Sequence, residues 1–140
     1  MADIIVDASV AKWYIPERDN GQALALRDDY LNGRHDLLAP GHLPFEVINA
    51  LKFSGHYEDD RLIDAATTLP EYGSKLIPYG EVGLVAEFAI DLDITLYDAS
   101  YLALADTKGA TVYTADSRLL DTTDRSAQSD RCSHIQEYSG

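Results

Sequence analysis

Residues 3–9, Asp-Ile-Ile-Val-Asp-Ala-Ser, form a short β-rich run that passes directly into a helix start. Asp7 and Ser9 favour that helix because their side-chain oxygens accept hydrogen bonds from its first free amides. The same order returns at residues 111–117, Thr-Val-Tyr-Thr-Ala-Asp-Ser. There the clearest β run of the chain precedes a short helix expected from Asp116 through Leu120. Both stretches predict a strand followed at once by a helix.

The rest of the sequence continues this alternation. Brief strands are expected at Leu37–Ala39, at Lys75–Ile77 and near Ile135, and helices over residues 20–31, 43–53, 59–69, 83–92 and 98–109. Parallel strands need crossover connections, which helices supply, so the pattern predicts an α/β fold with a parallel sheet between helices. Ligands in such sheets bind beyond the carboxyl ends of the strands, where Asp7 and Asp116 should lie.

The length and composition fit one domain over residues 1–140. The single cysteine, Cys132, has no partner for an internal disulfide, and no apolar run reaches the length of a membrane span. Residues 1–6 carry Asp3 and lack the basic region of a signal peptide. These features predict a cytoplasmic protein that does not enter a membrane.

The charge of the chain is strongly negative, with 24 acidic and 11 basic residues and a formal net charge of −13. A general polyanion binder is expected to be basic. Two explanations are open: a surface adapted to a high-salt cytoplasm, which we favour, and weak repulsion of nucleic acid. In molar salt the Debye length falls to about 3 Å, so an acidic protein can still approach RNA through a local metal site. Equal stability in low and high potassium chloride would contradict the high-salt explanation.

Four carboxylates stand out by their positions: Asp7, Glu46, Asp98 and Asp116. Each of the three aspartates begins an expected helix, so a simple N-cap role is open for each. Glu46 differs, because it lies within an apolar run suited to burial, where an unpaired carboxylate is costly. If the fold brings the four together, their mutual repulsion would raise their pKa values, and a divalent cation would remove that conflict.

The ligand chemistry of such a site indicates magnesium or manganese rather than zinc, because hard oxygen ligands have no cysteine or histidine cluster beside them. The histidines lack metal-ligand spacing, and surface or packing roles are expected for His35, His42, His56 and His134. A Gly-x-Ser-x-Gly motif and phosphate-binding glycine motifs are absent. The reaction that suits a carboxylate-held metal is phosphodiester hydrolysis, because the ion polarises a phosphoryl oxygen and activates water.

Four segments in this order resemble the PIN domain, and especially the VapC-type toxins of toxin-antitoxin pairs. They are Ile-Val-Asp-Ala-Ser-Val at 5–10, Pro-Phe-Glu-Val-Ile-Asn-Ala at 44–50, Leu-Tyr-Asp-Ala-Ser-Tyr-Leu-Ala-Leu-Ala at 96–105 and Tyr-Thr-Ala-Asp-Ser-Arg-Leu at 113–119. The resemblance extends over nearly the whole chain. It implies a three-layer α/β/α sandwich with a central five-stranded parallel sheet, and magnesium- or manganese-dependent endoribonuclease activity. It also implies a homodimer and a cognate VapB-like antitoxin that inserts a segment near the site.

Carried over residue by residue, the resemblance makes Asp7, Glu46, Asp98 and Asp116 the metal-binding and catalytic set. Ser9 and Thr114 match small hydroxyl positions that support these carboxylates by hydrogen bonds, although both could simply cap helix or loop amides. Two features depart from the family pattern. The composition is strongly acidic, and the polar residues 121–130 are longer than the usual connection to the last strand.

Several neighbouring residues have two open interpretations. Lys12 and Arg118 follow Asp7 and Asp116 closely enough to contact an RNA phosphate, or they are solvated helix charges. Asn49 is one turn from Glu46 on the expected helix and could orient it or contact substrate. Packing or a dimer surface is expected for Trp13 and Tyr14, and packing around Asp98 for Tyr97 and Tyr101.

The sequence therefore predicts a VapC-like endoribonuclease that hydrolyses single-stranded or looped RNA. Two other classes stay open. A phosphoacceptor signalling module also uses an acidic cluster with magnesium, but it needs a lysine beside an aspartate that follows a central strand. A catalytically inactive PIN-fold scaffold would keep the architecture without the reaction, although the presence of all four acids argues against it.

Overall fold

The computed structural model describes residues 3–11, 21–69, 75–78 and 82–140. Its centre is a sheet of five strands: β1 (Asp3–Val6), β2 (Asp36–Pro40), β3 (Lys75–Ile77), β4 (Thr111–Thr114) and β5 (Cys132–His134). All neighbouring strands are parallel, in the order β3-β2-β1-β4-β5. The predicted five-stranded parallel sheet is confirmed, and β1 is its central strand.

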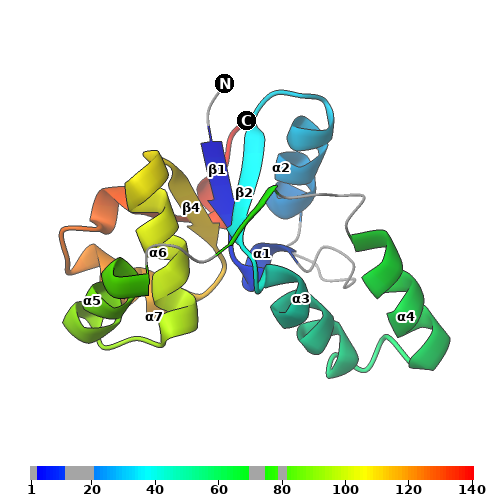
Figure 1. The fold of residues 1–140 in the computed structure, drawn as a ribbon. Helices are drawn as coiled ribbons and strands as arrows, with labels where there is room; N and C mark the ends of the chain where they lie inside the picture. Colours follow the sequence, from blue (N-terminus) through cyan, green and yellow to red (C-terminus); the bar gives the residue numbers. More distant parts are fainter. Residues whose placement is uncertain (1–2, 12–20, 70–74, 79–81) are drawn as a thin grey trace.

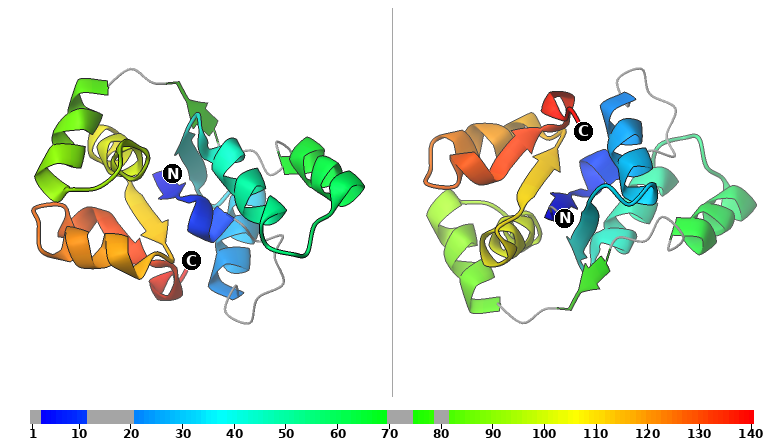
Figure 2. Two further views of the ribbon diagram at one scale, coloured as in Figure 1. Left: turned by 90° about the horizontal axis from the view of Figure 1, so that it is seen from below. Right: turned by 90° about the horizontal axis from the view of Figure 1, so that it is seen from above.

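Helices cover both sides of the sheet, as Figures 1 and 2 show. One side carries α1 (Ala8–Ala11), α2 (Gly21–Leu31), α3 (Leu43–Lys52) and α4 (Asp59–Thr68). The other carries α5 (Val82–Leu92), α6 (Leu96–Lys108) and α7 (Ser117–Asp124), and short 3-10 turns at Ser129–Arg131 and Ile135–Glu137 flank β5. The three-layer α/β/α sandwich expected from the sequence is confirmed.

Two expected helix boundaries are wrong by a few residues, and the last strand lies close to its expected position. The helix expected to begin at Asp98 begins at Leu96, because Thr95 is the N-cap and its hydroxyl accepts the Asp98 N–H at 3.1 Å. The helix after Asp116 extends to Asp124 rather than Leu120, which shortens the long polar connection expected over residues 121–130. The last strand is Cys132–His134, and Ile135 lies in the following 3-10 turn.

The core lies where the sheet meets α2, α3 and α6. Ile5, Val6 and Val112 of the central strands are completely buried, together with Leu102 of α6 and Leu26 of α2. Apolar side chains on both faces of the middle strands are typical of a parallel sheet covered on two sides. This packing holds the carboxyl ends of β1 and β4 side by side, because Val6 pairs with Tyr113.

Two further features bear on the expectations from composition. The thiol of Cys132 is buried, and burial raises its pKa to about 12, so it is an unreactive packing group. Among the helices of the described residues, none combines the length and the apolar character needed to cross a bilayer.

Candidate active site

The first group of acidic residues lies where β1 and β4 end. We call Asp7, Ser9, Thr114 and Asp116 the strand half of the site. Asp7 directly follows β1 and is only 7% exposed. The Ser9 N–H donates to Asp7 Oδ1 at 3.1 Å, the Ser9 hydroxyl donates to the same oxygen, and the Thr114 hydroxyl donates to Oδ2 at 2.5 Å. Both carboxylate oxygens of Asp7 are therefore fixed.

The same two hydroxyls connect Asp7 to the turn after β4. Ala115 N–H donates to Ser9 Oγ at 2.9 Å, and Asp116 N–H donates to Thr114 Oγ1 at 3.0 Å. The hydrogen bonds expected from Ser9 and Thr114 are thus present. Asp116 is also the N-cap of α7, because its Oδ1 accepts the N–H groups of Arg118 at 3.0 Å and Leu119 at 3.4 Å. The predicted N-cap role therefore holds for Asp116, and these hydrogen bonds occupy one of its two carboxylate oxygens.

Burial raises the pKa of Asp7 even though hydrogen bonds from Ser9 and Thr114 act in the opposite direction. No cation within the described residues offsets this charge through a salt bridge. Asp7 is therefore a fixed, buried carboxylate whose negative charge costs free energy unless a positive group binds beside it.

The second group lies on two helices. We call His42, Glu46, Asp98 and Tyr101 the helix half of the site. Glu46 is in the first turn of α3, and its Oε1 accepts the Tyr101 hydroxyl at 2.7 Å. His42, the N-cap of α3, lies one turn earlier, with its Nδ1 2.6 Å from the same oxygen. This is an ion-pair distance, but the Nδ1 is not aligned with Oε1 as in a hydrogen bond.

Asp98 lies in the first turn of α6, half-buried and facing the other acids. Burial raises its pKa, and the negative charges of Asp116 and Glu46 raise it further, while Thr95 and Arg118 act in the opposite direction. Burial raises the pKa of Tyr101, and its hydrogen bond to Glu46 and the charges of Glu46, Asp7 and Asp98 raise it further. The charges of Asp116 and Glu46 therefore act on Asp98, and those of Glu46, Asp7 and Asp98 act on Tyr101, so the four predicted acids lie around one region.

This donor set fits a hard divalent cation, because it offers carboxylate oxygens and an excess of negative charge. Within the described part of the chain, however, no three acidic, histidine or cysteine side chains lie close enough to hold one ion as they stand. The acids of the two halves are near enough to interact by charge but do not form a closed coordination shell. The ligand atoms are thus of the type that magnesium or manganese prefers, but the acidic side chains are not spaced closely enough to coordinate one ion.

The remaining sequence candidates separate clearly. Arg118 is exposed and near enough to Asp98 to lower its pKa. Asn49 is exposed, and the contacts made by the Glu46 carboxylate are with His42 and Tyr101 rather than with Asn49. Lys12 lies outside the described residues, as do Trp13 and Tyr14.

Sequence reasoning missed His42. The expected packing role fits His35, which is 4% exposed and lies between the carbonyls of Leu26 and Asp36. It does not fit His42. The signal was its position four residues before Glu46, a spacing that places both side chains on one face of a helix. Tyr101 is buried as expected, but its hydroxyl binds Glu46, and Tyr97 is mostly exposed.

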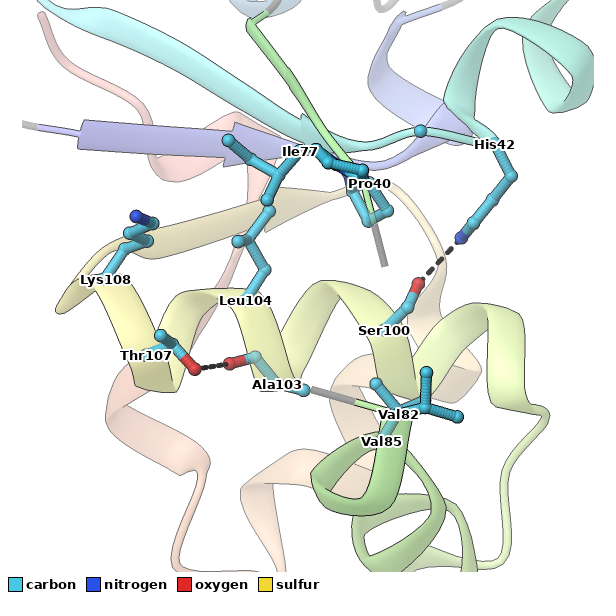
Figure 3. Close-up of a pocket in the computed structure, with 12 residues that line it drawn as sticks. Pro40, His42, Ile77, Val82, Val85, Ser100, Ala103, Leu104, Thr107 and Lys108 are labelled. Carbon is cyan, nitrogen blue, oxygen red and sulfur yellow. Dashed lines mark hydrogen bonds between the residues drawn. The ribbon is translucent and has the colours of Figure 1, made fainter. Parts of the chain in front are cut away.

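A pocket of about 480 Å³ borders the helix half, between the ends of β2 and β3 and helices α5 and α6. Figure 3 shows His42 and Ser100 at one end of it, joined by a hydrogen bond, and Lys108 at the other. Its walls are largely apolar and include Pro40, Ile77, Val82, Val85 and Leu104. Such walls offer few ligands for a metal ion, so the pocket adjoins the acidic region without being part of it.

Comparison with known proteins agrees with this fold. The sequence matches the family model of the PIN domain over residues 4–125. Two solved structures share the fold. "Crystal structure of PAE2754 from Pyrobaculum aerophilum" has 20% sequence identity, covers 96% of this chain and 92% of its own, and gives a TM-score of 0.64. "Structure of FitAB bound to IR36 DNA fragment" has 15% identity, covers 98% of both chains and gives 0.67.

A search of curated protein sequences gave no significant match. At these identities the two structures support the fold alone, whereas the family match spans most of the chain and includes Asp7, Glu46, Asp98 and Asp116. The chain belongs to the PIN domain family.

Proposed function

We propose that this protein is a metal-dependent endoribonuclease in which Asp7, Glu46, Asp98 and Asp116 hold magnesium or manganese. PIN domains are generally nucleases, and the resemblance found in the sequence assigns the four acids of this chain to the catalytic set. The observation that carries the proposal is the electrostatics of Asp98, whose pKa is raised by burial and by the charges of Asp116 and Glu46. A bound cation removes that repulsion.

The chemistry that such an ion supplies is polarisation of a phosphoryl oxygen, activation of water and stabilisation of the leaving oxygen. The protein contributes one buried carboxylate that is fixed by hydrogen bonds and further carboxylates that are partly exposed. Asp7 is held by Ser9 and Thr114, whereas Glu46 and Asp98 are partly exposed on helices. Because the described acids do not form a closed shell as they stand, we expect the side chains of Asp98 and Asp116 to move toward Asp7 and Glu46 when metal binds.

We also propose the biological setting. The VapC-like segments suggest the toxin of a type II toxin-antitoxin pair, with a VapB-like antitoxin as partner and a homodimer as its assembly. The neighbour named FitAB is described as bound to a DNA fragment, which is a property of that complex. A short open reading frame next to this gene, whose product co-purifies with the protein, would support the toxin role. Purification of the chain alone as a monomer would count against the homodimer.

The decisive experiment is RNA cleavage by the purified protein in high potassium chloride, with magnesium or manganese against a chelator. Asp98→Asn should abolish cutting. Asp106→Asn is the matched control, because Asp106 is on the same helix and makes only a surface ion pair with Arg131 at 3.7 Å. Metal-dependent cutting that is lost in Asp98→Asn and kept in Asp106→Asn supports the proposal.

No cutting with either metal would favour the inactive scaffold. Incubation with a small phosphodonor followed by intact-mass measurement tests the phosphoacceptor alternative. We expect no added phosphate on Asp7, because it is 7% exposed and both of its carboxylate oxygens already accept hydrogen bonds.

A further inference from the structure

His42 occupies the N-cap position of α3 without capping the helix with its side chain. Serine, threonine, aspartate and asparagine are the usual residues there, because their side chains accept free helix amides. The imidazole of His42 instead reaches across to two other groups. Its Nδ1 lies 2.6 Å from Glu46 Oε1, and its Nε2 lies 2.8 Å from Ser100 Oγ, the contact drawn in Figure 3.

The direction of the hydrogen bond to Ser100 follows from its second partner. The Ser100 hydroxyl donates its one hydrogen to the Tyr97 carbonyl at 2.5 Å. Its oxygen therefore accepts from His42, so the Nε2 carries a hydrogen. The ring is also held edge-on between two aromatic rings, those of Tyr97 and Tyr101, at centroid distances of 5.4 and 5.5 Å. His42 is thus fixed in orientation with its Nδ1 side toward Glu46.

Tyr101 approaches Glu46 from α6. Its side chain is 1% exposed and its hydroxyl donates to Glu46 Oε1 at 2.7 Å. Burial, the hydrogen bond to Glu46 and the charges of Glu46, Asp7 and Asp98 all raise the pKa of this hydroxyl far above its ordinary value. Tyr101 therefore keeps its proton and remains a donor to the carboxylate across the working pH range.

We propose that Tyr101 and His42 are positioning residues for Glu46: Tyr101 holds Oε1 by its hydrogen bond, the His42 ring confines the same oxygen by contact, and Oε2 is left free to face the metal. This inference rests on the proposed function. Among the described residues, Glu46 Oε2 has no hydrogen-bond partner, whereas Oε1 is in contact with both Tyr101 and His42. Glutamate has three rotatable side-chain bonds, so an unheld Glu46 in the first turn of α3 would sample many orientations. Side chains that orient metal ligands commonly change metal affinity or activity about 10- to 100-fold when removed.

The test measures Mn²⁺ binding by isothermal titration calorimetry on the full chain, together with kcat and KM for RNA cleavage. The variants are Tyr101→Phe, His42→Ala and His42→Asn. We expect Tyr101→Phe and His42→Ala to raise the Mn²⁺ Kd about 10-fold. They should lower kcat at a fixed Mn²⁺ concentration while leaving the KM for RNA nearly unchanged, and added Mn²⁺ should restore their cleavage. His42→Asn should lose less, because its amide nitrogen occupies nearly the position of Nδ1 and can donate to Oε1.

Matched controls exist in the same chain. Tyr113→Phe removes a half-buried tyrosine hydroxyl on β4, and the Tyr113 ring packs against Tyr138 rather than against Glu46. His56→Ala removes an exposed histidine between α3 and α4. Both should keep the wild-type Kd. Thermal unfolding of every variant in chelator identifies any loss of fold, and His42→Asn provides a folded comparison if Tyr101→Phe is destabilised.

The outcomes separate the two proposals. Wild-type protein that neither binds Mn²⁺ nor cuts RNA overturns the proposed function and this inference with it. Wild-type protein that does both, with an unchanged Kd in folded Tyr101→Phe and His42→Ala, overturns only the positioning role. A raised Kd with equal losses in His42→Ala and His42→Asn removes His42 from the inference and retains Tyr101.

Discussion

The two halves of the site are held in different ways. In the strand half, the pairing of Val6 with Tyr113 brings Asp7 beside Thr114, so sheet register alone brings the carboxylate to its donor. In the helix half, Tyr101 reaches Glu46 from a separate helix 55 residues away, and the Glu46 side chain is 32% exposed. The strand half is rigid because backbone hydrogen bonds fix it, whereas the helix half depends on how α3 and α6 pack.

This difference assigns separate tasks to the halves. A buried carboxylate with both oxygens occupied cannot adjust, so Asp7 is suited to define where an ion sits. The partly exposed Asp98 can adjust, so it is suited to close around the ion, while Glu46 presents the oxygen that Tyr101 leaves free. The division also explains why the acids interact by charge without forming a closed metal shell in the described residues.

The largest effect is expected from removing one acid from each half. Asp7→Asn and Asp98→Asn should each lower RNA cleavage at least about a thousandfold, and the double variant should be no worse, because members of one catalytic unit are strongly non-additive. Single-turnover cleavage in high salt measures this. Losses that multiply in the double variant would mean that the two halves act independently, and would contradict their assignment to one catalytic unit.

A smaller effect is expected from removing one donor of the strand half. Thr114→Val keeps the shape but leaves Asp7 Oδ2 and the Asp116 N–H without their partner in a fully buried position. The free energy of unfolding should fall by about 1–3 kcal/mol, the usual cost of an unsatisfied buried polar group. Urea unfolding measures it. Thr111→Val, at the other end of β4, is the control and should be nearly neutral.

In the helix half, removing a charged group should raise stability instead, and the gain should depend on pH. The folded pKa of Asp98 is raised above its ordinary value of 3.8, so the ionised carboxylate costs stability once the pH exceeds that value. In chelator, Asp98→Asn should therefore raise the melting temperature near pH 7. The gain should shrink as the pH falls through the raised pKa toward 3.8, and vanish below it, where Asp98 is protonated in both states. A gain that persists in acid would mean that charge is not its cause.

The smallest effect is expected at the rim. Arg118 is exposed and acts on Asp98 only through its charge. If it contacts an RNA phosphate, Arg118→Gln should raise KM at every RNA sequence tested. It should also reduce the slope of log affinity against log salt by about 0.7, the contribution of one phosphate contact on a single strand. The Mn²⁺ Kd should stay unchanged, and a change there would place Arg118 with the ligands instead.

Much of this molecule could be predicted from local sequence. The β runs at residues 3–6 and 111–114, each followed closely by an aspartate, indicated a parallel sheet with acids at its carboxyl end. For Ser9 and Thr114 the sequence left two roles open, support of these acids or capping of nearby amides. The boundaries at Asp98 and Asp124 were less accurate, because Thr95 competes as the N-cap of α6 and polar residues 121–124 continue α7. Such competition between neighbouring residues is weakly encoded in composition.

The sequence by itself determined the sheet, the order of its elements and the choice of four candidate acids, because strand and helix periodicity and capping act over a few residues. Only the tertiary structure decided that His42 faces Glu46 and Ser100, that Tyr101 donates to Glu46, and that the acids influence one another without closing into a shell. These contacts join residues on separate helices, whose relative placement follows from packing of the whole core rather than from any local pattern.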